Sequence, residues 1–364
     1  MRTTPAPTTD DDPLLCPVFS GSGFDERLKA ALLDALWPIP EGADGPGVDD
    51  FAAYFAQLER ECHPSWSEFH AIRSFSDAIA LLNLIRSKPG WSLDQLLKDI
   101  RDDASTRALS SADEARLLVS IEFVIRCWLM TDITTDGRNR RYFSYRGRSL
   151  RWSKEDSLSQ LVPRSIAEPS VVYQERTATA AGCFSTFLNV VDMQRITGFK
   201  IIWTDNLEDH LIMRGKSLYL FAHPTALQRL DVSETSKDIL PKGLIQETLE
   251  TLYLLMPLEN PACQRWLREE VGKWRLDREL CRPHVSDRRK GSYRYWQERL
   301  SEVSDAFDST KATSPFQWWY DRRDMNMWWN YWLIVFSLAL TVFFGLIQSV
   351  TGILQVLGVG SGKD

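Results

Sequence analysis

The sequence predicts an α+β protein with a predominantly helical cytosolic region and one C-terminal transmembrane α-helix. Three observations lead to this prediction. Apolar residues recur at helical spacing through residues 21–135. Two short strand-like apolar runs follow farther along the chain. Residues 325–362 contain no charged side chain, which is typical of a membrane-spanning segment.

The composition limits the class of protein. Hydrophobic residues make up 44% and charged residues 25% of the chain, as in ordinary globular proteins. A length of 364 residues allows a sizeable core. The net charge of -6 gives no reason to expect nucleic acid as a partner. The six cysteines lie far apart without a C-x-x-C pair, which indicates reduced thiols and a cytosolic location.

Residues 1–20 are predicted to form a disordered N-terminus, because they are rich in Pro, Thr and Asp. They lack the apolar core of about 7–15 residues that a signal peptide needs. Residues 21–135 are predicted to form a helical domain, with helices over 25–37, 50–61 and 74–86. Two further helices are expected to begin at capping boxes, formed by Ser92 with Gln95 and by Ser111 with Glu114.

Residues 136–310 are predicted to form a mixed α+β domain. Strands are expected at 198–203 and 217–221, and an amphipathic helix at 244–256. Between residues 264 and 300, eleven Lys or Arg stand against six Asp or Glu. We therefore expect basic C-terminal helices, for which anionic lipid headgroups are a suitable partner.

The segment 137–152 interleaves six Arg with four aromatic residues. Such a pattern can bind RNA or anionic headgroups. It also fits a short β-hairpin around Arg146 and Gly147, with the Arg side chains on its wet face. We favour the hairpin.

The predicted transmembrane helix covers residues 331–359. Seventeen of these residues are Leu, Ile, Val or Phe, which together favour insertion by about 5–10 kcal/mol. As a helix the segment would measure about 43 Å, against a hydrocarbon core of about 30 Å. It must therefore tilt, or its end must lie in the interface. The alternative is a buried helix of a soluble domain.

A tryptophan-rich juxtamembrane segment, residues 311–330, precedes the span. Basic residues on this side predict that it faces the cytosol, and aromatic residues mark the membrane interface. Only Lys363 and Asp364 carry side-chain charge beyond the span, which predicts a tail-anchored, single-pass protein of the endoplasmic reticulum or another intracellular membrane. The predicted membrane-interface residues are Arg322, Arg323, Trp328, Trp329 and Trp332.

One face of the span carries small and polar residues at spacings of four and three, which places them on a single stripe. Small residues allow close helix approach in lipid, and Gln can hydrogen-bond across such a contact. The stripe predicts a homo-oligomer formed through the helix or, alternatively, a polar pore lining. Glycine is also simply common in membrane helices. The stripe residues are Thr341, Gly345, Gln348, Gly352 and Gln355.

No hydrolase, metalloprotease, Walker or dinucleotide-binding motif is present. The best polar cluster contains Asp205, Asp209 and His210, which could bind a metal or carry acid–base chemistry. In the structural alternative, Asp205 caps a short helix, Glu208 completes the cap, and His210 is a satisfied polar residue. We favour the structural alternative and therefore predict no catalytic residue, cofactor or metal.

Three stretches resemble a large group of uncharacterised membrane proteins of filamentous fungi. They are GFKIIWTDNLEDHL (198–211), LPKGLIQETLETLYLLMP (240–257) and FQWWYDRRDMNMWWNYWLIVFSLALTVFFGLIQSVTGILQV (316–356). The group shares a W-T-x-N-L-x-D-H-L phrase, a G-L-I-x-E-T-L helix and a tryptophan-rich approach to a terminal helix. The resemblance covers residues 183–357. It implies a fungal source and a membrane topology, and it does not imply an activity.

The terminal region is also similar to CorA-type magnesium channels, in which a cytosolic helical domain leads into a C-terminal membrane helix. This chain has Asp324-Met325-Asn326 where those channels have Gly-Met-Asn, and it has no second span. We therefore expect a membrane-tethered interaction or regulatory module. The alternatives are an oligomeric ion channel or transporter and a membrane-associated enzyme without a recognisable motif.

Overall fold

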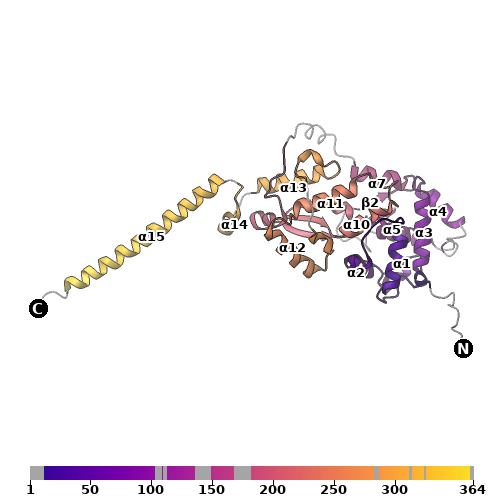
Figure 1. Ribbon diagram of the computed structural model, residues 1–364, viewed down its shortest axis with the longest axis horizontal. Helices are drawn as coiled ribbons and strands as arrows, with labels where there is room; N and C mark the ends of the chain where they lie inside the picture. The colour runs from indigo at the N-terminus through magenta and orange to yellow at the C-terminus, as the bar shows by residue number, and fades with distance from the viewer. Residues whose placement is uncertain are drawn as a thin grey trace, which may run out of the picture.

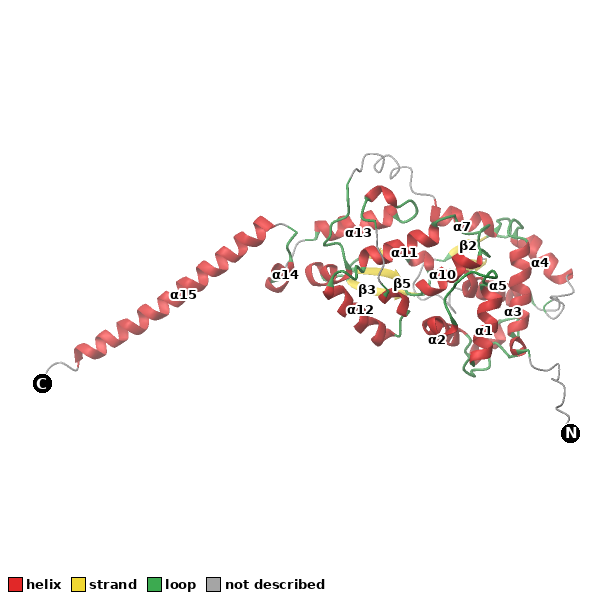
Figure 2. Cartoon of the chain, viewed as in Figure 1, coloured by secondary structure: helices red, strands yellow, loops and turns green. Residues whose placement is uncertain are grey.

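The computed structural model describes residues 12–102, 109, 113–135, 149–167, 182–282, 287–310, 314–323 and 325–360. The described chain is mostly helical and has one long apolar helix at its C-terminal end, as predicted. Figure 1 shows a folded body from which this helix projects, and Figure 2 shows the small amount of strand within the body.

In the N-terminal part of the body, the described residues form five α-helices. They are α1 (Glu26–Leu36), α2 (Ala52–Glu61), α3 (Phe75–Ser87), α4 (Leu93–Asp102) and α5 (Glu114–Leu129). The predicted capping box of Ser92 and Gln95 is present, because each side chain accepts the other residue's backbone N–H. Ser111 of the second predicted box lies outside the described residues; the described residue that precedes α5 as its N-cap is Asp113, and its side chain makes no capping bond.

Strands appear where the chain leaves α5 and again in the middle of the body. β1 (Ile133–Thr135) pairs in parallel with β2 (Leu150–Trp152). β3 (Lys200–Thr204) pairs in parallel with β5 (Ser217–Phe221), and β4 (Met213–Arg214) joins β5 antiparallel. The two strands predicted from apolar runs are thus confirmed.

The hairpin predicted within residues 137–152 lies mostly outside the described residues, and so does its turn, Arg146 and Gly147. The described end of this segment contains β2, which pairs in parallel with β1, a strand that precedes the predicted hairpin. The hairpin therefore stays a prediction.

The remaining described α-helices, except for the long α15, lie in the C-terminal part of the body, where α7 packs against β2 and α13 against β4. They are α7 (Leu158–Ala167), α9 (Val190–Asp192), α10 (Pro224–Ser233), α11 (Leu244–Leu255), α12 (Pro261–Trp274), α13 (Gln297–Ser309) and α14 (Pro315–Tyr320). α11 fills the predicted helix at 244–256 and is buried along most of its length. Its burial makes it the central helix of the body.

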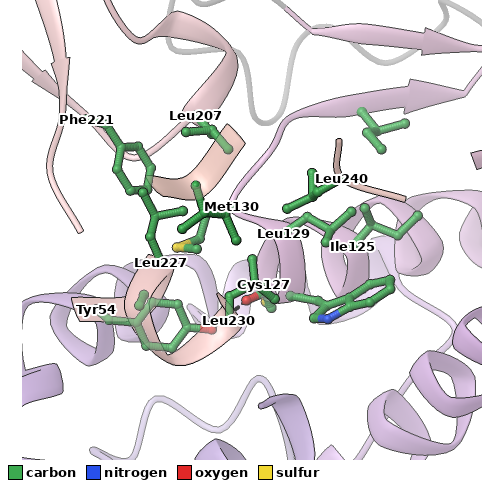
Figure 3. Close-up of a cluster of buried hydrophobic side chains, with 14 of the residues drawn as sticks. Tyr54, Ile125, Cys127, Leu129, Met130, Leu207, Phe221, Leu227, Leu230 and Leu240 are labelled. Carbon is green, nitrogen blue, oxygen red and sulfur yellow. Dashed lines mark hydrogen bonds between the residues drawn. The ribbon is translucent and has the colours of Figure 1, made fainter. Parts of the chain in front are cut away.

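One hydrophobic core joins the two predicted domains. Buried side chains form a continuous cluster that runs from Val18 to Phe307. Figure 3 shows Cys127 and Leu129 of α5 packed with Leu227 and Leu230 of α10. The division near residue 135 stays a prediction, but the packed side chains on either side of it belong to the same core.

α15 (Met325–Gly360) leaves the body at its C-terminal end and projects away from it (Figure 1). The most apolar stretch of its segment Trp328–Gln355 has a mean hydropathy of 2.3, and none of that stretch is buried against the rest of the protein. This segment is about 42 Å long, which exceeds the hydrocarbon thickness of a bilayer. The described chain therefore contains one helix long and apolar enough to cross a membrane. The buried-helix alternative is wrong.

Candidate functional site

The predicted polar cluster lies on a short turn between β3 and β4. Leu207–Asp209 forms one 3-10 turn, and its N-cap is Asn206, whose side-chain oxygen accepts the backbone N–H of Glu208 at 3.2 Å. The predicted cap, Asp205, is directed elsewhere. The turn brings Asp205, Asp209 and His210 close in sequence, but each side chain has a different partner.

His210 is completely buried and uses both ring nitrogens. Its Nδ1 accepts the backbone N–H of Phe221 at 3.3 Å, so the hydrogen is on Nε2, which lies 2.8 Å from the Thr251 hydroxyl. The ring packs edge-on against Trp296. Burial, together with the positive charge of Arg299, lowers the pKa of His210 to about 3. His210 is therefore a neutral structural residue at physiological pH.

Asp205 pairs with His223 across the end of the sheet. Oδ1 of Asp205 lies 2.7 Å from Nε2 of His223. Burial alone would raise the pKa of Asp205, but the hydrogen bond and the charge of His223 together lower it. His223 is buried between the rings of Tyr54 and Phe221. The pair thus links the sheet to α2.

Asp209 faces the turn itself. Its Oδ2 accepts the side-chain amide of Asn206 at 3.2 Å, and Arg214 lies 3.9 Å from its other oxygen. Asn206 also accepts the backbone N–H of Asp132, the residue that leads into β1. These bonds fasten the turn to the end of the N-terminal helices.

Sequence reasoning missed a partly buried ionic cluster beside this turn. Arg126 of α5 lies between two carboxylates, with its Nε 2.6 Å from Asp132 and its Nη1 3.6 Å from Glu61. Burial raises the pKa of both acids and Arg126 opposes that rise. The signal that could have found the cluster is a charged residue near the end of the apolar helix 117–129.

α11 organises a second set of buried polar groups. Glu247 accepts three successive backbone N–H groups, from Arg294, Tyr295 and Trp296, at 2.9, 2.7 and 2.7 Å. These amides lead into α13, so Glu247 caps that helix from outside. Trp296 Nε1 also donates to the hydroxyl of Thr248 at 2.8 Å. The segments 203–211 and 240–257, which carry the resemblance to fungal membrane proteins, therefore contact each other in one buried polar cluster.

The predicted interface residues divide into two kinds. Arg323 is turned toward the body: it forms a salt bridge with Asp321 at 2.8 Å and donates to the carbonyl of Thr310 at 2.7 Å, and to the carbonyl of Phe307. Arg322 is exposed, and its guanidinium lies 5.6 Å from the ring of Trp328. Arg323 therefore holds the linker against α13, and Arg322 stays on the surface.

The tryptophans form an aromatic group at the start of α15. Trp332 packs edge-on against Trp319 of α14, with ring centroids 4.7 Å apart. Trp328 packs against Trp329 and donates its Nε1 hydrogen to the Trp319 carbonyl at 3.4 Å. Amphipathic rings at this position suit a membrane interface, where one edge is apolar and the other wet.

The predicted helix stripe lies on exposed positions of α15. A Cβ placed at Gly345 or at Gly352 would have no neighbour within 4 Å. The hydroxyl of Thr341 donates to its own helix, to the carbonyl of Ser337 at 2.8 Å. Gln348 and Gln355 are exposed as well. The stripe is thus open on the single chain.

The charged and polar side chains described above chiefly stabilise the fold. Asp205, Asp209 and His210 do not converge, and among the described residues no group of three or more His, Cys, Asp or Glu is arranged to hold a metal ion. All six cysteines are free thiols. Comparison with protein-family models, curated proteins and solved structures returned no match. The resemblance to fungal membrane proteins therefore stays a prediction.

Proposed function

We propose that this chain is a single-pass, tail-anchored membrane protein whose folded body is a cytosolic interaction or regulatory module. The observation that carries the proposal is the uncovered α15. Leu333, Ile334 and Leu338 are 59%, 68% and 64% exposed, and side chains like them continue along the helix. Exposed apolar surface of this extent needs a lipid or protein environment.

The polar groups of the body favour an interaction module over a catalytic site. The groups that resembled a site take part in bonds that hold the body together: His210 with Thr251, Asp205 with His223, and Asp209 with Asn206. A rigid body joined to a membrane by a short linker is suited to presenting a binding surface at that membrane.

Alkaline carbonate extraction of the full chain tests the anchor. We expect the wild type to stay with the membrane fraction. Leu340→Arg/Ile347→Arg should be extracted, because each Arg near the centre of a span costs about 2.5–3.5 kcal/mol. The matched variant Leu340→Ala/Ile347→Ala should stay in the membrane. Extraction of the wild type would refute the anchor.

Orientation needs a separate test. The exposed Arg322 on the body side of the span favours a cytosolic body. A glycosylation acceptor added after Asp364 should be modified in microsomes, and one added at the N-terminus should not. The opposite pattern would place the body on the lumenal side and exclude a cytosolic module.

Replacement of 331–359 by an unrelated apolar span separates the module from a channel. A tethered module keeps its cellular phenotype with a foreign anchor, because the body carries the function. A channel loses its function, because the span is its pore. Loss of the phenotype with normal expression and membrane insertion would contradict the module.

A further inference from the structure

α14 connects the body to the membrane helix and lies against a basic part of the body. It contacts the π-helical turn Met193–Thr197, and the guanidinium of Arg195 lies 5.2 Å from the ring of Tyr320. A Cβ at Gly198 would lie 3.8 Å from the side-chain amide of Gln317 and 4.0 Å from the ammonium of Lys216. These contacts place the start of the sheet beside α14.

Four exposed cations surround this junction: Arg195, Lys200, Lys216 and Arg322. We call them the membrane-proximal basic cluster. Lys200 and Lys216 are on neighbouring strands, joined by a backbone bond of 2.7 Å from the Lys200 N–H to the Lys216 carbonyl. No carboxylate in the described ranges forms an ion pair with any of the four, although many other exposed cations of the body are paired.

The cluster continues into the aromatic start of α15. Arg322 lies over Trp328, and the neighbouring Trp319 is 52% exposed. The short helix α14 therefore connects the basic cluster and the exposed tryptophans to α15. The most apolar stretch of α15 is not covered by any described part of the body. Such continuity places the cations close to the headgroup layer whenever α15 is inserted, where their attraction to anionic lipid is strong.

The basic block at 264–300, which the sequence favoured for lipid contact, uses several of its arginines internally. Arg288 donates to the carbonyls of Ser185 and Leu254, and Arg299 donates to those of Glu208 and His210. Arginines bonded in this way fix the fold and have fewer donors left for a membrane surface.

We propose that the membrane-proximal basic cluster docks the body onto the anionic cytosolic leaflet, so that the end of the sheet that bears Lys200 and Lys216 faces the lipid. This inference rests on the proposed membrane anchoring. The partner is a lipid surface that contains headgroups with net negative charge, such as phosphatidylserine. α15 supplies the attachment, and the cluster fixes the orientation of the body on the leaflet.

The experiment uses the full chain in nanodiscs of neutral phosphatidylcholine, with or without about 30% phosphatidylserine. Hydrogen–deuterium exchange is followed in peptides that cover 193–217 and 314–323, with peptides from α3 and α4 as internal reference. Each cation at an anionic surface strengthens binding by roughly fivefold, so three contribute about a hundredfold. We expect exchange over 193–217 to slow by roughly tenfold or more in phosphatidylserine, and about 0.5 M salt to abolish the effect.

Three variants make the result specific. Arg195→Gln/Lys200→Gln/Lys216→Gln should lose the slowing, whereas Arg195→Lys/Lys200→Arg/Lys216→Arg keeps the charges and should retain it. The matched variant Arg73→Gln/Lys98→Gln/Arg101→Gln removes three exposed cations near α3 and α4, at the other end of the body (Figure 1), and should also retain it.

The outcomes distinguish the docking surface from the membrane anchor. Equal exchange in the two lipid compositions, or slowing that persists in the glutamine variant, overturns the docking surface but leaves the anchor intact. Failure of the full chain to assemble into nanodiscs of either composition refutes the membrane anchor itself. Slowing that depends on phosphatidylserine and on the three cations supports the proposal.

Discussion

At the scale of the residue, His210 makes the fold sensitive to pH. Its ring is buried and neutral, with a pKa of about 3, whereas an unfolded His has a pKa of about 6.5. Between these values the unfolded state binds more protons than the folded state. The free energy of unfolding therefore falls as the pH drops through this window, and the contribution of neutral His210 is complete above pH 6.5.

We predict that His210→Gln reduces this pH dependence. From pH 7.5 to 5.5 the wild type should lose about 1 kcal/mol more of its unfolding free energy than the variant. Urea unfolding followed by tryptophan fluorescence, in detergent micelles that hold α15, measures the difference. The same loss in both proteins would show that His210 is not buried and neutral.

The partly buried ionic cluster of Arg126, Glu61 and Asp132 leads to a prediction of larger magnitude. Arg126→Met leaves the partly buried Glu61 and Asp132 without their shared cation, and should lower the free energy of unfolding by about 3 kcal/mol, the lower end of the range for a buried pair. Arg126→Met/Glu61→Gln/Asp132→Asn removes the charges together and should recover part of that loss. Denaturant titration compares the variants, with the exposed Arg73→Met as control. A single variant as stable as this control would contradict the cluster.

At the scale of the element, α15 combines a lipid-exposed helix with one stripe of small and polar residues. We predict that the stripe associates the full chain into a discrete oligomer in micelles. Gly345→Leu/Gly352→Leu should return the protein mass to that of the monomer, because added side chains keep the helices apart. Light scattering measures this mass.

A matched variant controls for bulk alone. Ala339→Leu/Val350→Leu adds side-chain volume on the opposite face of α15 and should leave the oligomer unchanged. A monomeric wild type would reduce α15 to a plain anchor and remove the channel alternative.

At the scale of the whole molecule, the shared core predicts cooperative unfolding. Leu129 of α5 and Leu227 of α10 are fully buried in the same cluster. Leu129→Ala and Leu227→Ala should each lower the free energy of unfolding by about 2–5 kcal/mol. Hydrogen exchange should register each loss in both helices. A loss confined to the mutated helix would indicate two independent domains, divided near residue 135.

Much of the local structure could be predicted from the sequence. The helices 26–36 and 244–255, the strand 217–221 and the long apolar helix follow from apolar spacing, which neighbouring residues encode. The cap of α5 and the pairing of β1 with β2 could not be predicted. Parallel pairing depends on where the chain between the strands runs, and no short turn signal specifies that path.

The sequence by itself determined the long apolar helix α15 and the order of most helices and strands in the body, because hydrophobic spacing acts over a few residues. That α15 is uncovered was decided by the tertiary structure. Only the tertiary structure decided the role of the polar residues. The partner of His210 is Thr251, and that of Asp205 is His223, and neither is its neighbour along the chain. The same holds for Arg195, which gains its place beside Tyr320 only when α14 folds back on the body. Contacts between distant residues are set by how helices and sheet pack, and this packing decides whether a charged group stabilises the fold or faces a membrane.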